Sequence, residues 1–302
     1  MERLQTDILG MKLETPFLLA SGILDQTSKS MEKLLELGMG GVVTKSIGSN
    51  PRKGHPNPTM VELETGLLNA MGLPNPGIDK YLDELNNLRS SIGKKPIIGS
   101  VYASTTEEFA ELSHKMEKGD VDAVELNLSC PHAEGYGASI ASDLELVGEV
   151  IISVKNKVDI PVLAKLPPAA QIAETASVSE KAGADAVVAI NTVKSMAINF
   201  ETREPILGNK VGGYSGKGIK PIGLRCVYEI YEEVDIPIIG CGGINTGRDA
   251  LEYILAGASA LQMGSSIYYR GKDAAQKISK EMNELMEKED IENIKDIIGK
   301  AH

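Results

Sequence analysis

The stretch Glu125-Leu126-Asn127-Leu128-Ser129-Cys130-Pro131-His132 decides how the chain is organised, because an apolar strand runs directly into polar and reactive side chains. Pro131 cannot continue a helix or a β-ladder, so we expect Cys130 to lie on a turn. A lone cysteine is commonly a small buried hydrophobe. Asn127 and Ser129, however, carry hydrogen-bonding groups that are unusual in a plain core. A buried strand that ends in this way is typical of barrel enzymes.

Along the whole chain, expected strands and expected helices alternate eight times. The alternation predicts a closed parallel barrel, the (β/α)8 TIM barrel, although two smaller domains also fit a length of 302 residues. No linker or composition shift marks a boundary, so we expect residues 1–302 to form a single catalytic domain. The expected strands lie at residues 17–22, 41–46, 96–101, 123–126, 161–165, 186–192, 237–243 and 260–265.

Further segments frame the predicted barrel. Residues 6–14 predict an N-terminal hairpin that turns at Gly10 and covers one end. Two long loop excursions, at about residues 47–76 and 193–218, interrupt the alternation at the C-terminal face. Loops of this length without their own secondary structure are usually functional.

Composition restricts the partners and the compartment. The net charge of −11 disfavours a nucleic-acid-binding surface, which would need a basic patch. No apolar run approaches the roughly 20 residues of a membrane span, and the chain begins without an apolar signal region. Three widely spaced cysteines, Cys130, Cys226 and Cys241, suit a reducing cytoplasm and exclude a four-cysteine zinc or iron–sulfur site on this chain alone. We therefore expect a cytoplasmic protein with no metal, membrane or nucleic-acid partner.

The strand ends suggest a phosphate site. Gly242-Gly243 and Gly264-Ser265 end the last two strands, where such barrels commonly hold a phosphate on backbone N–H groups. The loop Gly216-Lys217-Gly218 would add donors. The alternative interpretation is that these glycines only make tight turns.

Lysines and amides also follow apolar strands. Lys45 and Lys165 would be costly inside a barrel mouth without an anionic partner, and a reduced flavin would supply one. The alternative for each is a surface lysine whose stem alone is buried. Asn69, Asn127 and Asn191 suit a flat heterocycle with an imide edge and a carboxylate, although an isolated Asn is often a turn former.

Several motifs, in the right order, resemble the dihydroorotate dehydrogenase family. They are Asn69-Ala70-Met71-Gly72-Leu73-Pro74-Asn75, Asn127-Leu128-Ser129-Cys130-Pro131, residues 191–218, and Gly240-Cys241-Gly242-Gly243-Ile244. Cysteine at position 130 resembles the soluble class 1 enzymes. Class 2 enzymes use Ser there and carry a membrane-associating N-terminal extension, which we do not expect here. Residues 196–203 and 212–216 look most like subclass 1B, which reduces NAD through a second subunit that holds FAD and a [2Fe–2S] cluster.

The resemblance implies FMN-dependent oxidation of dihydroorotate to orotate in de novo pyrimidine (UMP) biosynthesis. Cys130 would accept the C5 proton, while the C6 hydride would go to N5 of FMN. A homodimer is the default, joined by the electron-transfer subunits in a heterotetramer. The residues that would bind FMN are Ser21, Lys45, Ser46, Asn127, Lys165, Ile190, Gly216, Gly242, Gly243, Gly264 and Ser265. Those that would bind the pyrimidine are Lys45, Asn69, Met71, Gly72, Leu73, Asn127, Asn191 and Thr192.

Two positions depart from the family pattern. His132 stands where relatives often have Asn, and Gly99-Ser100-Val101-Tyr102 lacks the Asn expected beside the flavin. Other interpretations stay open at this point. A dihydropyrimidine dehydrogenase-type domain would normally carry extra cysteine-rich segments, and a dihydrouridine synthase would bind tRNA. A non-catalytic phosphate-binding barrel would show neither bound FMN nor substrate-dependent bleaching.

Replacement of Cys130 by Ala is expected to keep FMN bound but to lower turnover by about 10²–10⁴-fold, the usual contribution of a general base. Cys130→Ser should recover some rate only at high pH, because a hydroxyl is a much weaker acid than a thiol. Steady-state turnover and the visible spectrum of each variant test this, and near wild-type turnover of Cys130→Ala would exclude the role.

Overall fold

Eight parallel strands form a closed barrel in the computed structural model, which describes residues 2–128 and 140–302. Each strand pairs with its successor in the barrel, and closure comes from pairing of β16 with β3. The predicted TIM barrel is therefore confirmed. The strands are β3 (Phe17–Leu19), β4 (Gly41–Val43), β7 (Ile97–Val101), β8 (Ala123–Asn127), β9 (Val162–Leu166), β10 (Ala186–Ala189), β15 (Ile238–Cys241) and β16 (Ala258–Met263).

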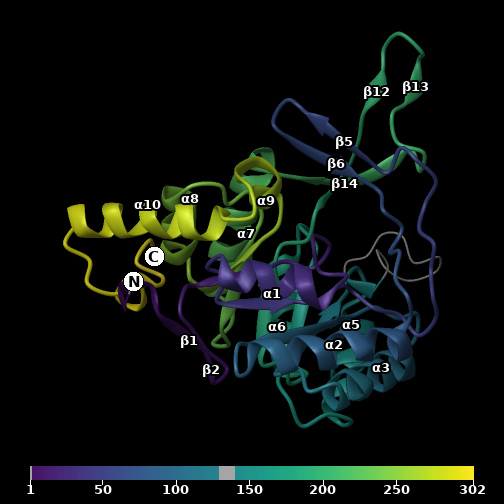
Figure 1. The fold of residues 1–302 in the computed structure, drawn as a ribbon, viewed down its shortest axis with the longest axis horizontal. Helices are drawn as coiled ribbons and strands as arrows, with labels where there is room; N and C mark the ends of the chain where they lie inside the picture. The colour runs from purple at the N-terminus through teal and green to yellow at the C-terminus, as the bar shows by residue number, and fades with distance from the viewer. Residues whose placement is uncertain (1, 129–139) are drawn as a thin grey trace.

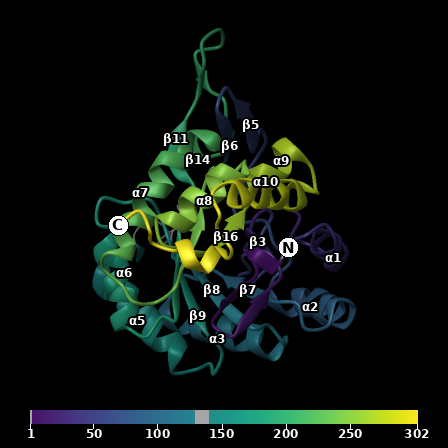
Figure 2. The ribbon, with the colours of Figure 1, turned by 90° about the vertical axis from the view of Figure 1, so that its left-hand side faces the viewer.

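Helices surround the barrel and bury its outer face (Figure 2). In α3 the Thr105 side chain accepts a hydrogen bond from the Glu108 N–H at the N-terminus, and Phe109, Leu112 and Met116 fall on one buried stripe. That spacing is the amphipathic pattern of a helix with one face against a core. The helices are α1 (Ser28–Glu36), α2 (Ile78–Ile92), α3 (Thr106–Lys118), α5 (Leu144–Lys155), α6 (Ile172–Lys181), α7 (Lys220–Tyr231), α8 (Gly247–Leu255), α9 (Ser265–Arg270) and α10 (Ala274–Lys288).

The predicted hairpin closes the end of the barrel at which the strands begin. It consists of β1 (Thr6–Ile8) and β2 (Met11–Leu13), which are antiparallel. Its apolar side chains join a core cluster with inward-facing strand residues such as Val43 and Leu163. Because this end is sealed by apolar side chains, polar groups can gather only at the opposite mouth.

The two excursions are not structureless loops, contrary to expectation. The first contains β5 (Met60–Leu63) and β6 (Gly66–Asn69), and the second contains β11 (Val193–Met196) and β14 (Val211–Ser215). These four strands form one antiparallel sheet, the excursion sheet, in the order β11-β14-β6-β5. A small ribbon, β12 (Ile198–Asn199) with β13 (Glu204–Pro205), extends beyond it at the upper right of Figure 1.

Short half-exposed strands explain why this sheet was missed. Residues of β5 and β11 alternate between exposed and partly buried positions over only four residues. Pairing of β14 with β6 joins segments far apart in the sequence, such as Gly213 and Asn69. A side chain at Gly213 would collide with Thr192, so this strand needs a glycine to pass close to the barrel mouth.

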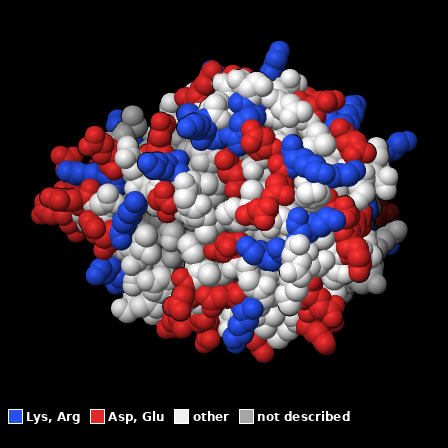
Figure 3. All heavy atoms as spheres, turned by 90° about the horizontal axis from the view of Figure 1, so that it is seen from below, with Lys and Arg blue, Asp and Glu red and all other residues white. Residues whose placement is uncertain are grey.

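The surface and the C-terminal region complete the description. Short 3₁₀ turns lie at Glu2–Leu4, Lys217–Ile219 and Ile294–Ile297, and α10 buries Ile278, Met282 and Met286. Acidic and basic side chains are interspersed over the face seen in Figure 3. Among residues 2–128 and 140–302, no helix combines the length and apolar character that crossing a membrane requires.

Shortening the hairpin's Ile8 to Ala should lower the free energy of unfolding by about 2–5 kcal/mol, the usual cost of removing a fully buried aliphatic side chain. Ile8 is 1% exposed, whereas Lys12 on the same hairpin is exposed and its replacement by Ala should have an effect within about 0.5 kcal/mol. Urea unfolding of both variants measures the difference. Equal stabilities would show that the hairpin does not seal the barrel.

Candidate active site

One cavity of about 390 Å³ lies at the carboxyl ends of the barrel strands, beneath the excursion sheet. This is the end at which barrel enzymes place their active sites. Every residue of the predicted FMN and pyrimidine sets lines this cavity. Cys130 and His132 lie outside the described residues. The volume falls within the range of small-molecule and cofactor sites.

A cradle of glycines forms one side of the cavity. Gly216, Gly242 and Gly243 have φ values of +98°, +127° and +72°, which residues with side chains rarely adopt. A Cβ at Gly243 would lie 2.8 Å from the Gly216 carbonyl oxygen, so the two loops meet as bare backbone. A Cβ at Gly264 would meet only Ala20 within 4 Å, at 3.7 Å. The cradle therefore leaves backbone amides accessible to a phosphate.

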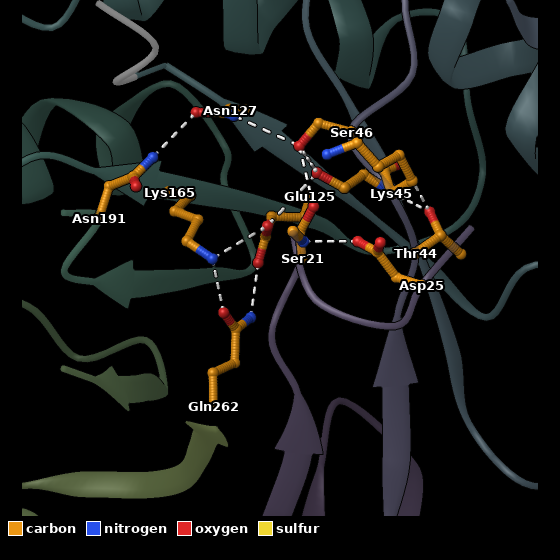
Figure 4. Close-up of polar contacts among 12 residues, drawn as sticks. Ser21, Asp25, Thr44, Lys45, Ser46, Glu125, Asn127, Lys165, Asn191 and Gln262 are labelled. Atoms are coloured by element: carbon orange, nitrogen blue, oxygen red, sulfur yellow. Dashed lines mark hydrogen bonds and ion pairs between the residues drawn. The ribbon is translucent and has the colours of Figure 1, made fainter. Parts of the chain in front are cut away.

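Three buried side chains that contact one another form the floor of the cavity. The Lys165 ammonium donates to Gln262 Oε1 at 2.6 Å and lies 3.4 Å from Glu125 Oε1. Gln262 Nε2 in turn donates to Glu125 Oε2 at 2.6 Å (Figure 4). We call these three residues the floor triad. Glu125 and Gln262 were not predicted from the sequence, where the only available signal was a single polar residue within each apolar strand.

Serine hydroxyls connect the floor triad to the first strands. Ser21 Oγ lies 3.0 Å from Ser46 Oγ, which lies 2.8 Å from Ser100 Oγ. Ser100 donates to Glu125 Oε1 at 3.4 Å, and Asn127 Nδ2 donates to Ser46 Oγ at 3.3 Å. Ser100 belongs to the segment that lacks the expected Asn, so at this position a hydroxyl contacts the floor triad.

The ammonium groups of Lys45 and Lys165 differ in their contacts. Lys45 is only 7% exposed, yet among the described residues no hydrogen bond or ion pair engages its ammonium group. The nearby Asp25 carboxylate accepts from the Gly22 N–H, and its backbone carbonyl accepts from the Tyr81 hydroxyl at 2.6 Å. Burial raises the pKa of Asp25, while the positive charge of Lys45 acts in the opposite direction. The ammonium of Lys45 therefore remains available to an anion in the cavity.

The three amides singled out from the sequence converge on the cavity. Asn191 Nδ2 donates to Asn127 Oδ1 at 3.3 Å, and Asn191 Oδ1 accepts from the Thr192 N–H at 2.7 Å. The excursion sheet brings Asn69 to the same cavity, where its Nδ2 donates to the Gly213 carbonyl at 3.2 Å. Asn75 instead accepts from the Gly77 N–H and behaves as a turn former.

The charges of the cavity favour anionic ligands. Among the described lining residues the charged ones are Lys45, Lys165 and Glu125. Two cations and one carboxylate leave a positive balance, which suits a phosphate and a second anionic group. Across residues 2–128 and 140–302, no cluster of three or more His, Cys, Asp or Glu side chains is arranged to hold a metal ion.

A parallel barrel whose mouth holds bare glycine backbone, buried lysines and converging amides is typical of barrel enzymes that bind a phosphate-containing ligand. A family model described as dihydroorotate dehydrogenase matches residues 3–286. The chain therefore belongs to the dihydroorotate dehydrogenase family, whose members use FMN to oxidise dihydroorotate in pyrimidine synthesis. The resemblance expected from the motifs is confirmed.

Relatives match over almost the full chain. The protein named dihydroorotate dehydrogenase B (NAD(+)), catalytic subunit, of Methanocaldococcus jannaschii is 49% identical over 302 residues, 99% of this chain and 98% of its own. The protein of the same name from Pyrococcus horikoshii is 50% identical over 299 residues, 99% of this chain and 97% of its own. A dihydroorotate dehydrogenase structure from Eimeria tenella, in complex with ferulenol, has a TM-score of 0.87 at 22% identity. The match covers 100% of this chain and 89% of the Eimeria tenella chain, and it supports the fold.

Replacement of Asp25 by Asn should stabilise the protein at neutral pH. A carboxyl whose pKa is raised on folding holds its proton more tightly in the folded state, so stability falls as pH rises above the ordinary Asp pKa of about 3.9. The advantage of Asn should therefore disappear in acid. Urea unfolding at neutral and acidic pH measures it, with the exposed Asp83→Asn as control. A less stable Asp25→Asn protein at neutral pH would contradict the argument.

Proposed function

We propose that this chain is the FMN-binding catalytic subunit of an NAD-linked dihydroorotate dehydrogenase. The observation that carries the proposal is the single cavity that brings together the glycine cradle, two lysines and the three amides. The full-length relatives named as catalytic subunits support the NAD link. On this proposal residues 1–302 act as one catalytic domain that takes dihydroorotate and releases orotate.

The residues present fit FMN. The backbone amides of Gly216, Gly242, Gly243 and Gly264, with Ser265, would hold its phosphate. Bound FMN would supply a two-electron acceptor for hydride. Lys165 would place a positive charge against the flavin ring, and the remaining predicted contacts would line the ring. These are Ser21, Lys45, Ser46, Asn127 and Ile190.

The other predicted residues would hold the pyrimidine. The Lys45 ammonium would pair with the dihydroorotate carboxylate, because a buried cation gains most from a desolvated anion. Amide groups of Asn69, Asn127 and Asn191 can both donate to and accept from the imide edge. Thr192, Met71, Gly72 and Leu73 complete the lining on this side.

Cys130 would take the proton from C5, which is acidified by the adjacent carbonyl. It follows Asn127 by three positions in the sequence, and Asn127 lines the cavity. A thiol becomes a workable base at neutral pH when a nearby cation, such as Lys45 or a protonated His132, favours its thiolate. With the hydride from C6 accepted by bound FMN, this chain's own residues would keep water from the thiolate and orient the substrate by its carboxylate.

Electrons would leave through a partner. The three cysteines of this chain cannot hold a [2Fe–2S] cluster by themselves, so FAD and that cluster would reside on an electron-transfer subunit. We further propose that the catalytic chain forms a homodimer, which two such subunits complete to a heterotetramer. The cytoplasmic location expected from cysteine usage stays a prediction.

A visible spectrum of the purified protein, recorded anaerobically, is the decisive test. We expect flavin bands that bleach when dihydroorotate is added, and reoxidation by NAD only when the electron-transfer subunit is also present. Flavin bands that persist would exclude dihydroorotate as substrate. A colourless protein that also fails to take up added FMN would exclude the proposed function altogether.

A further inference from the structure

The family resemblance gives Glu125 no role, yet among the described lining residues it is the least exposed charged side chain. It is 0% exposed, lines the cavity and carries the only carboxylate among the described lining residues. Three donors surround it: the ammonium of Lys165, the amide of Gln262 and the hydroxyl of Ser100. Figure 4 shows the side chains of Glu125, Lys165 and Gln262 pointing toward one another.

Stability alone is a poor reason to keep this arrangement. Burying two charges costs several kcal/mol per ion, and well-packed apolar residues often replace such pairs without loss. The floor triad instead fixes the position of one ammonium. Lys165 has three N–H donors, of which one contacts Gln262 and one faces Glu125. One donor remains, and Lys165 lines the cavity.

We propose that Glu125 is a positioning residue that fixes the Lys165 ammonium against FMN and, by partly cancelling its charge, keeps the reduction potential of the flavin low. The inference rests on the proposed FMN site. It concerns the chain's own charges, and the reduction potential can be measured without any turnover.

The direction of the effect follows from electrostatics. Two-electron reduction places negative charge on the flavin ring, which a nearby cation stabilises and a nearby carboxylate destabilises. The three side chains of the floor triad are buried, so these charges act through a low effective dielectric constant. Removing the carboxylate while keeping the lysine should therefore favour reduced flavin.

Two variants separate charge from packing. Glu125→Gln removes the negative charge but leaves its amide facing that of Gln262, so one hydrogen bond is lost. The double variant Glu125→Gln with Gln262→Glu exchanges the two side chains and restores the net charge. Every hydrogen bond can then re-form, because the amide now on β8 would donate to the carboxylate now on β16, and the Lys165 ammonium would again contact both.

The measurement is the midpoint potential of bound FMN, by anaerobic equilibration with reference dyes. Glu125→Gln should favour reduction at least tenfold, which is a rise of about 30 mV for a two-electron couple. The double variant should return towards the wild-type value. Glu108→Gln should change nothing: Glu108 is a half-buried structural carboxylate that accepts from Ser49 and Ser104, and it does not line the cavity.

Other results would overturn the inference. An unchanged or lower potential in Glu125→Gln with FMN fully bound would show that the carboxylate does not act on the flavin. Loss of FMN from Glu125→Gln that the exchange does not reverse would assign Glu125 to the stability of the barrel. Wild-type protein that binds FMN but is not bleached by dihydroorotate would refute the proposed substrate, while the potentials would still decide the role of Glu125.

Discussion

The buried ammonium of Lys165 is the interaction on which the rest of the site depends. A charge held inside a barrel has to be compensated, and removal of one partner of a buried pair typically costs about 3–5 kcal/mol. Two other strands supply the compensation, because Glu125 on β8 lies 3.4 Å from the Lys165 ammonium and Gln262 on β16 accepts a hydrogen bond from it. The ring of strands then points Glu125, Lys165 and Gln262 at one another.

The two ends of the barrel solve opposite problems. At the end where the strands begin, the hairpin supplies apolar side chains that fill the opening. At the other end, strands lead into the starts of helices, where backbone N–H groups lack partners within the helix. Polar side chains also gather there. The cavity is built from such groups: the backbone of the glycine cradle, the hydroxyls of the serines and the three amides. The excursion sheet lies over this cavity. The candidate site therefore lies at the end of the barrel that apolar side chains do not fill.

Sequence patterns predicted the barrel because alternation of strands and helices has a period that local composition reveals. The residues predicted to bind FMN and the pyrimidine line one cavity, since the carboxyl ends of parallel strands must converge. Glu125, Gln262 and Asp25 could not be predicted in this way. Each is a single polar residue that is faced by side chains from other elements, so its meaning appears only in three dimensions. The excursion sheet was missed for a related reason, because its strands are short and pair across distant segments.

The excursion sheet has a consequence for the order in which the protein is built. Asn69 reaches the cavity through a strand that pairs with residues 213–215, and the barrel itself is closed only by residues 261–263. A growing chain that has released its first two hundred residues therefore still lacks both a finished barrel and a finished binding site. Because loop closure must precede such non-local contacts, assembly of the site is coupled to completion of synthesis. Incomplete chains would thus be unable to sequester the cofactor from the finished enzyme.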